Sequence, residues 1–117
     1  MKIIACIKQV PDTETRIKLK AGSSSIDTKD VKFIINPYDE FALEEALRVK
    51  EKVGGEVTVI TVGPPDVDQS IRECFARGVD NGIRIWSDSF ENIDPLGTAG
   101  VLAQVIKNNG YDLIICG

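Results

Sequence analysis

The sequence contains no histidine, and only 6% of its 117 residues are aromatic. Histidine is the commonest general acid–base and metal ligand, so its absence excludes a Ser-His-Asp triad within this chain and leaves no sign of a metal site. The three cysteines, Cys6, Cys74 and Cys116, are odd in number and far apart. They show no metal-ligand spacing and indicate a reducing compartment, so we expect a cytoplasmic location.

Long hydrophobic runs are also missing. No apolar stretch reaches the length that crosses a membrane, and residues 3–7 are too few for a signal peptide. The net charge of −4 argues against broad binding to nucleic acid or to an anionic membrane. With 43% hydrophobic and 27% charged residues, the composition is that of an ordinary globular protein. We expect a single domain over residues 1–117, with neither nucleic acid nor membrane insertion among its interactions.

Predicted strands and helices alternate along the chain. Apolar runs rich in β-branched residues predict strands at 2–7, 56–62, 82–86 and 112–116. Helical periodicity predicts helices over 37–53, from Asp66 to about Gly78, and from Pro95 to Gly110, with Asp66 and Gln69 as a capping box. This alternation predicts an α/β fold, an open parallel sheet with helices on both faces. Right-handed crossovers then favour the strand order 82–86, 56–62, 2–7, 112–116.

Residues 8–35 interrupt this alternation and are expected to be irregular. A Gly22-Ser23-Ser24-Ser25 turn lies between two short apolar pieces, 17–19 and 31–34. These pieces are candidates for a small hairpin.

The junction between residues 33 and 47 is the most informative stretch. An apolar run stops at Asn36, whose side chain suits a helix N-cap, and Pro37 suits the first helical position. The acidic residues that follow lie near the positive end of the helix dipole, where negative charge is stabilising. We interpret them as dipole partners and a solvated face. A helix N-terminus beside strand ends is where ligands bind in an open parallel sheet. An ordinary capped helix explains the same residues, so the local pattern leaves both interpretations open.

The last strand carries two expectations. Gly117 directly follows a buried strand, where an α/β domain usually continues into a binding loop, so we interpret the chain as a truncated domain, incomplete at its C-terminus. Strand 112–116 should then lie at an exposed edge and promote self-association.

Familiar nucleotide and redox motifs are absent. The residues after the first strand, Lys8-Gln9-Val10-Pro11-Asp12-Thr13, contain no glycine-rich dinucleotide motif, and the chain has no P-loop. Cys6 and Cys116 are candidates for redox activity, but free cysteine is commonly found in cores, so we expect both to be buried strand residues.

Several stretches resemble the β subunit of electron transfer flavoprotein, the family that includes the FixA proteins linked to nitrogen fixation. They are the opening 1–13, the helix entry Ile35-Asn36-Pro37-Tyr38-Asp39-Glu40 with residues 42–46, the run 61–64 with 72–80 and 83–85, and the final strand 112–117. The resemblance covers the whole chain.

The resemblance implies an adenine-nucleotide-binding domain, flavodoxin-like and of the HUP type. Such a subunit pairs with an α subunit that holds most of the FAD, and itself holds a structural AMP, or a second FAD in electron-bifurcating members. It carries electrons from dehydrogenases to a quinone oxidoreductase or another acceptor, and it is an electron carrier and not an enzyme, because the flavin does the redox chemistry. The positions that match the family's AMP contacts are Cys6, Asn36, Pro37, Tyr38, Asp39, Val62 and Gly117.

Some of these implications remain to be separated from alternatives. Tyr38-Asp39-Glu40 is more similar to the AMP-carrying branch than to the bifurcating one. Because the family's phosphate loop lies beyond Gly117, residues 1–117 should bind AMP weakly or not at all. A nucleotide-binding module of the universal-stress-protein type stays open, although no glycine-rich phosphate loop is visible. An adenylating enzyme on the same fold would need a Ser-Gly-Gly-type loop after the first strand, where Lys8-Gln9-Val10-Pro11 stands instead.

Overall fold

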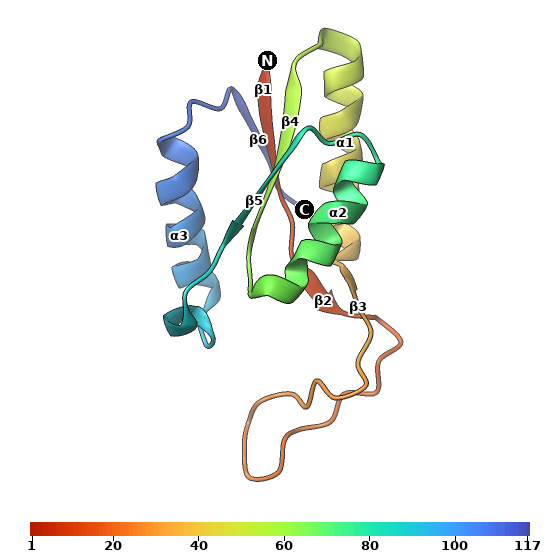
Figure 1. Ribbon diagram of the computed structural model, residues 1–117, viewed down its shortest axis with the longest axis vertical. Coiled ribbons are helices and arrows are strands. Elements are labelled where there is room, and N and C mark those ends of the chain that lie inside the picture. Colours follow the sequence, from red (N-terminus) through yellow and green to blue (C-terminus); the bar gives the residue numbers. More distant parts are fainter.

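The computed structural model describes residues 1–117 and has an α/β fold, as predicted (Figure 1). Its strands are β1 (Lys2–Cys6), β2 (Gln9–Pro11), β3 (Phe33–Ile35), β4 (Glu56–Val62), β5 (Asn81–Ile85) and β6 (Leu113–Ile115). Its helices are α1 (Pro37–Val53), α2 (Asp68–Ala76) and α3 (Pro95–Lys107), with short 3-10 turns η1 (Pro65–Val67) and η2 (Asp88–Phe90). None of the helices combines the length and the hydropathy needed to cross a membrane.

Four strands form a parallel sheet in the order β5-β4-β1-β6, which confirms the predicted order. Ala5 of β1 lies opposite Val59 of β4 and Ile115 of β6. The chain leaves β1 for β4 on one side and returns to β6 on the other. The sheet therefore has its topological switch point beside the end of β1, the place where open α/β sheets bind ligands.

Helices cover both faces of the sheet, but unequally. Helices α1 and α2 lie on one face and α3 lies on the other (Figure 1). Ile3 and Ala5 join a core cluster of 11 buried residues on the α1 face, whereas Ile4 joins a cluster of only three on the α3 face. This alternation follows from the two-residue period of a strand. The α3 face is consequently the more open side, and Ile114 of the edge strand β6 remains 51% exposed.

Helix α1 has the predicted bounds, 37–53. The Asn36 side chain accepts a hydrogen bond from the Tyr38 N–H at 2.9 Å, as a cap should. Leu43 and Ala46 are fully buried against the sheet. The helix ends at Gly54, whose positive φ of 77° favours glycine.

Two local predictions are wrong. The hairpin forms between β2 and β3, with Val10 opposite Ile34, while residues 12–32 extend away as an arm (Figure 1). Within the arm Leu19 forms a single antiparallel bridge with Ile26. The capping box at Asp66 also fails, because residues 65–67 form the turn η1 and α2 starts only at Asp68 without a side-chain cap.

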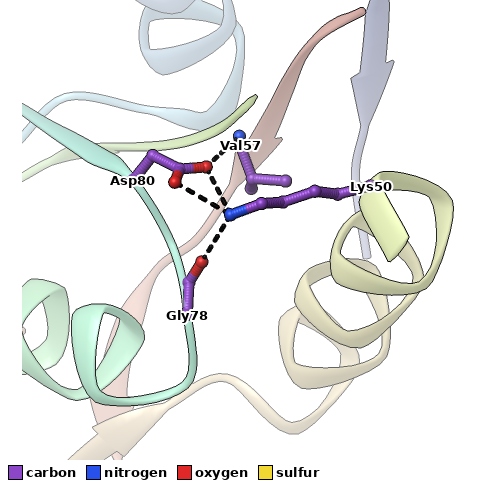
Figure 2. Close-up of polar contacts among 4 residues, drawn as sticks. All are labelled: Lys50, Val57, Gly78 and Asp80. Carbon is purple, nitrogen blue, oxygen red and sulfur yellow. Dashed lines mark hydrogen bonds and ion pairs between the residues drawn. The ribbon is translucent and has the colours of Figure 1, made fainter. Parts of the chain in front are cut away.

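At the amino end of the sheet a polar cluster joins α1 to β4 (Figure 2). The Lys50 ammonium contacts both oxygens of Asp80 at 2.8 Å and the Gly78 carbonyl at 3.0 Å. The Asp80 carboxylate accepts from the Val57 N–H at 2.8 Å, and the Asp80 N–H donates to the Val57 carbonyl at 2.9 Å. These bonds from Lys50 and Val57 lower the pKa of Asp80.

Candidate functional site

A cavity of about 250 Å³ lies at the carboxyl end of the sheet. Cys6 ends β1, Val62 ends β4, and Gly117 follows β6, so three neighbouring strands converge on it. The N-terminal regions of helices α1 and α3 complete the wall. The lining residues are Cys6, Ile7, Lys8, Asn36, Asp39, Val62, Thr98, Leu102, Cys116 and Gly117.

The structure brings five of the seven residues predicted for the site into this cavity, namely Cys6, Asn36, Asp39, Val62 and Gly117. The other two, Pro37 and Tyr38, are absent from its lining. The Tyr38 side chain is 73% exposed, and Pro37 is exposed too. They occupy the first turn of α1, next to Asn36 and Asp39, which do line the cavity.

Asp39 connects the parts of this wall. Its carboxylate accepts from the Lys8 N–H at 2.8 Å and also from the backbone N–H of Gly117. It thereby holds the chain after β1 and the chain after β6 against the start of α1. Burial raises the pKa of Asp39, and the hydrogen bonds from Lys8 and Gly117 only partly oppose that rise.

Gly117 fits because it has no side chain. A Cβ atom at this position would overlap the carbonyl group of Tyr38 and a carboxylate oxygen of Asp39. The close approach lets the Asp39 carboxylate reach the Gly117 N–H. Glycine is therefore required here by the packing of backbone against backbone.

A larger cavity of about 650 Å³ continues from the first one and shares Lys8, Val62 and Thr98 with it. Two aromatic rings line it: Trp86 and Phe90 pack edge to face with centroids 6.5 Å apart. Together the two cavities combine a lysine, small polar groups and aromatic surface. That mixture of apolar walls with a few polar groups is typical of small-molecule sites.

Five lining residues were not among those predicted for the site, namely Ile7, Lys8, Thr98, Leu102 and Cys116. Lys8 had a usable signal, because it follows the first strand directly and therefore lies at its carboxyl end. Thr98 and Leu102 lie on α3, and the sequence did not indicate that this helix reaches the strand ends.

The cysteines occupy three different environments. Cys74 is fully buried, and burial raises its pKa to about 11. Cys6 is half-buried, and burial, then Cys116, then Asp39 raise its pKa to about 12. Cys116 is exposed and lies one residue past the end of β6 at Ile115. The expectation that Cys6 and Cys116 are both buried strand residues is therefore wrong for Cys116.

Two other acidic residues of α1, Glu40 and Glu45, form ion pairs with arginines. Glu40 forms a two-pronged ion pair with Arg77 of the α2 C-terminus, with one N···O distance of 3.0 Å. Glu45 contacts Arg48 at 3.7 Å. No group of three or more His, Cys, Asp or Glu side chains is placed to hold a metal ion.

The arm contains a further hollow of about 510 Å³. Its lining is almost wholly charged or polar and contains residues of both signs. Among them, the Lys32 Nζ lies 3.9 Å from the Asp12 Oδ2. It shares no residue with the two cavities at the strand ends. Mixed, solvated charge of this kind does not single out a ligand.

Comparison with known proteins gives a consistent result. Residues 24–117 match the electron transfer flavoprotein domain family. An electron transfer flavoprotein subunit beta from Thermoanaerobacterium thermosaccharolyticum is 40% identical over 117 residues, covering 100% of this chain and 45% of the relative. Protein FixA from Azotobacter vinelandii is 44% identical over 113 residues, covering 97% of this chain and 40% of the relative.

A third relative carries a different name. The acryloyl-CoA reductase electron transfer subunit gamma from Anaerotignum propionicum is 35% identical over 120 residues, covering 100% of this chain and 45% of the relative. The chain thus spans less than half the length of each of these relatives.

Proposed function

This chain belongs to the electron transfer flavoprotein family, and on that premise we propose that it forms part of a β subunit. With an α subunit, that β subunit carries electrons from dehydrogenases through FAD to an acceptor such as a quinone oxidoreductase. The name of the acryloyl-CoA reductase subunit adds a reductase as a second kind of electron partner.

The role proposed for residues 1–117 is to hold an adenine nucleotide, AMP. The observation that carries this role is the position of the cavity, at the carboxyl ends of β1, β4 and β6 beside the switch point of the sheet. Ligands of open α/β sheets bind at that point. Five of the residues that the family resemblance predicted for the site line this cavity, which supports the role.

The donor set of the cavity suits such a ligand. The Lys8 ammonium offers positive charge for a phosphate, and the start of α1 at Asn36 contributes the positive end of a helix dipole. Val62 and Leu102 offer apolar surface for a base. Residues 1–117 contain no glycine-rich phosphate loop, so the affinity of this chain alone should be weak, with a Kd of about a millimolar.

FAD supplies the electron-transfer chemistry when it is bound, mainly by the α subunit. The residues of this chain bind, orient and shield; none is placed as an acid–base pair or nucleophile with a partner base. The chain acts in this proposal as an electron carrier component and not as an enzyme by itself.

A second FAD in place of AMP is the alternative that a specific observation favours. The adjoining 650 Å³ cavity adds room beyond the first cavity, and Trp86 and Phe90 give it aromatic surface for a ring system. If the ligand is AMP, we expect it to occupy the smaller cavity alone. If the ligand is a second FAD, we expect it to fill both cavities.

Saturation-transfer NMR on the 117-residue chain tests the proposal with AMP and FAD as separate ligands. We expect AMP signals to be transferred in the wild type and lost in Val62→Arg, which fills the wall shared by both cavities. Ile17→Arg is the matched control, because Ile17 lies 63% exposed on the arm. Equal transfer in wild type and Val62→Arg, or none in the wild type at millimolar AMP, contradicts the proposed site.

A further inference from the structure

Two cysteines from distant parts of the sequence lie side by side at the site. In the β1–β6 ladder Ile4 lies opposite Ile114 and Ala5 opposite Ile115. Continuing this register places Cys6 level with Cys116. Strand alternation puts Cys6 on the α3 face, where it packs against the Ile4 cluster, and puts Cys116 on that face too.

Both sulfur-bearing side chains also line the 250 Å³ cavity. Neighbouring strands run about 4.8 Å apart, which falls inside the range of roughly 4.4 to 6.8 Å between Cα atoms that a disulfide spans. The third cysteine, Cys74, is fully buried on the opposite face in the α1-side core. Only Cys6 and Cys116 therefore combine proximity with a place in the lining of the same cavity.

We propose that Cys6 and Cys116 form a dithiol in the wall of the cavity that closes to an intrachain disulfide when hydrogen peroxide oxidises it. The exposed Cys116 meets the oxidant first. Its thiolate attacks one peroxide oxygen, the O–O bond breaks, and a sulfenic acid and hydroxide form; the hydroxide takes up the thiol proton as water. The Cys6 sulfur then attacks the Cys116 sulfur, and the S–O bond breaks as the S–S bond forms. The second water leaves with the Cys6 proton, so two thiols lose two electrons and one peroxide becomes two waters.

The disulfide would join the end of β1 to the chain that follows β6. The same two segments are held by Asp39 through the Lys8 and Gly117 N–H groups. Oxidation would add a covalent link across the wall of the proposed nucleotide site. A ligand in the cavity should in turn shield both sulfurs from peroxide; this shielding rests on the proposed function, whereas the disulfide itself does not.

The test is oxidation of the folded 117-residue chain with hydrogen peroxide, followed by alkylation of free thiols and peptide mass spectrometry. We expect a disulfide between the peptides that contain Cys6 and Cys116, with Cys74 alkylated as a free thiol. Cys74→Ala should form the same bond. Cys116→Ser, a change at an exposed position, should form no intrachain disulfide, and Cys6→Ala repeats that test from the other sulfur.

Specific products would overturn the proposal. They are sulfinic acid on Cys116 with Cys6 still reduced, disulfide-linked dimers as the main product, or a bond to Cys74 in the folded chain. Millimolar AMP should slow formation of the bond severalfold in the wild type. If the bond forms at the same rate with and without AMP, the nucleotide site fails while the dithiol stands.

Discussion

The two ends of the sheet each contain an aspartate that accepts backbone N–H groups, yet the two carboxyl groups differ. At the amino end Asp80 is paired with Lys50, and its pKa is lowered. At the carboxyl end Asp39 has backbone partners from Lys8 and Gly117, and burial raises its pKa. Paired charge is typical of a structural cluster, whereas a carboxyl group with a raised pKa beside a cavity is typical of a site. We therefore expect the amino end to stabilise the fold, and we propose the carboxyl end as the part that binds a ligand.

The largest loss of stability should come from breaking the polar cluster of Asp80, Lys50 and Val57 at the amino end of the sheet. Asp80→Ala removes the partner of the buried Val57 N–H and leaves Lys50 without its carboxylate, so we expect a loss of about 2 kcal/mol in the free energy of unfolding. Asp68→Ala is the matched control, because it breaks only the exposed Asp68–Arg84 pair at 2.9 Å and should lose less than about 1 kcal/mol. Urea denaturation measures both. Equal losses would contradict a special role for Asp80.

At the carboxyl end the same change should have a smaller effect on stability. Asp39→Ala frees the Lys8 and Gly117 N–H groups, but both lie near solvent, and the cost of burying the Asp39 charge disappears as well. We expect a loss of about 1 kcal/mol by urea denaturation. We also expect weaker AMP signals in saturation-transfer NMR. A loss larger than that of Asp80→Ala would reverse the comparison between the two ends.

Lowering the pH should change the contributions of Asp80 and Asp39 to the free energy of unfolding in opposite directions. The lowered pKa of Asp80 gives stability that is present above the pKa of an unfolded carboxyl group and is lost as the pH falls. The raised pKa of Asp39 gives stability that is present in acid and is lost as the pH rises through the folded value. From about pH 7 to pH 3.5 the cost of Asp80→Asn should shrink and that of Asp39→Asn should grow. Parallel urea curves at both pH values check this, and equal pH trends for the two variants would refute it.

The smallest effect on stability should come from the edge strand. Ile114→Lys replaces a side chain that is 51% exposed, so the free energy of unfolding should change by less than about 0.5 kcal/mol. Self-association should fall, because the charge blocks pairing along β6 and contact through the open α3 face. Light scattering over a concentration series reports it. A wild-type chain that stays monomeric at high concentration would show that this edge does not associate.

Much of the fold was predictable because its signals are local and repeated. The bounds of α1 follow from the Asn36-Pro37 entry and the Gly54 exit, and β4 follows from its β-branched run. The strand order required only right-handed crossovers and short connections. The hairpin was not predictable in detail, because each of its strands has only three residues and their register depends on contacts elsewhere.

The site was predictable to the extent that strand ends define it. Cys6 and Val62 follow from that rule, and Asn36 from the capped helix beside it, whereas Asp39 was expected only from the family resemblance. Leu102 and Thr98 could not be assigned, because the tilt of α3 across the sheet is a tertiary feature. Neighbouring positions for β1 and β6 were predicted, but the register that pairs Cys6 with Cys116 appears only in the structure.

Amide chemical shifts of the isotope-labelled chain during titration with AMP test the central claim most directly, since they report both ends of the sheet at once. The account predicts shifts at Lys8, Asp39 and Thr98 that saturate with a Kd of about a millimolar, while Val57 and Asp80 stay unchanged. Shifts centred on Val57 and Asp80, or no shifts at Lys8 and Thr98 at saturating AMP, would contradict it.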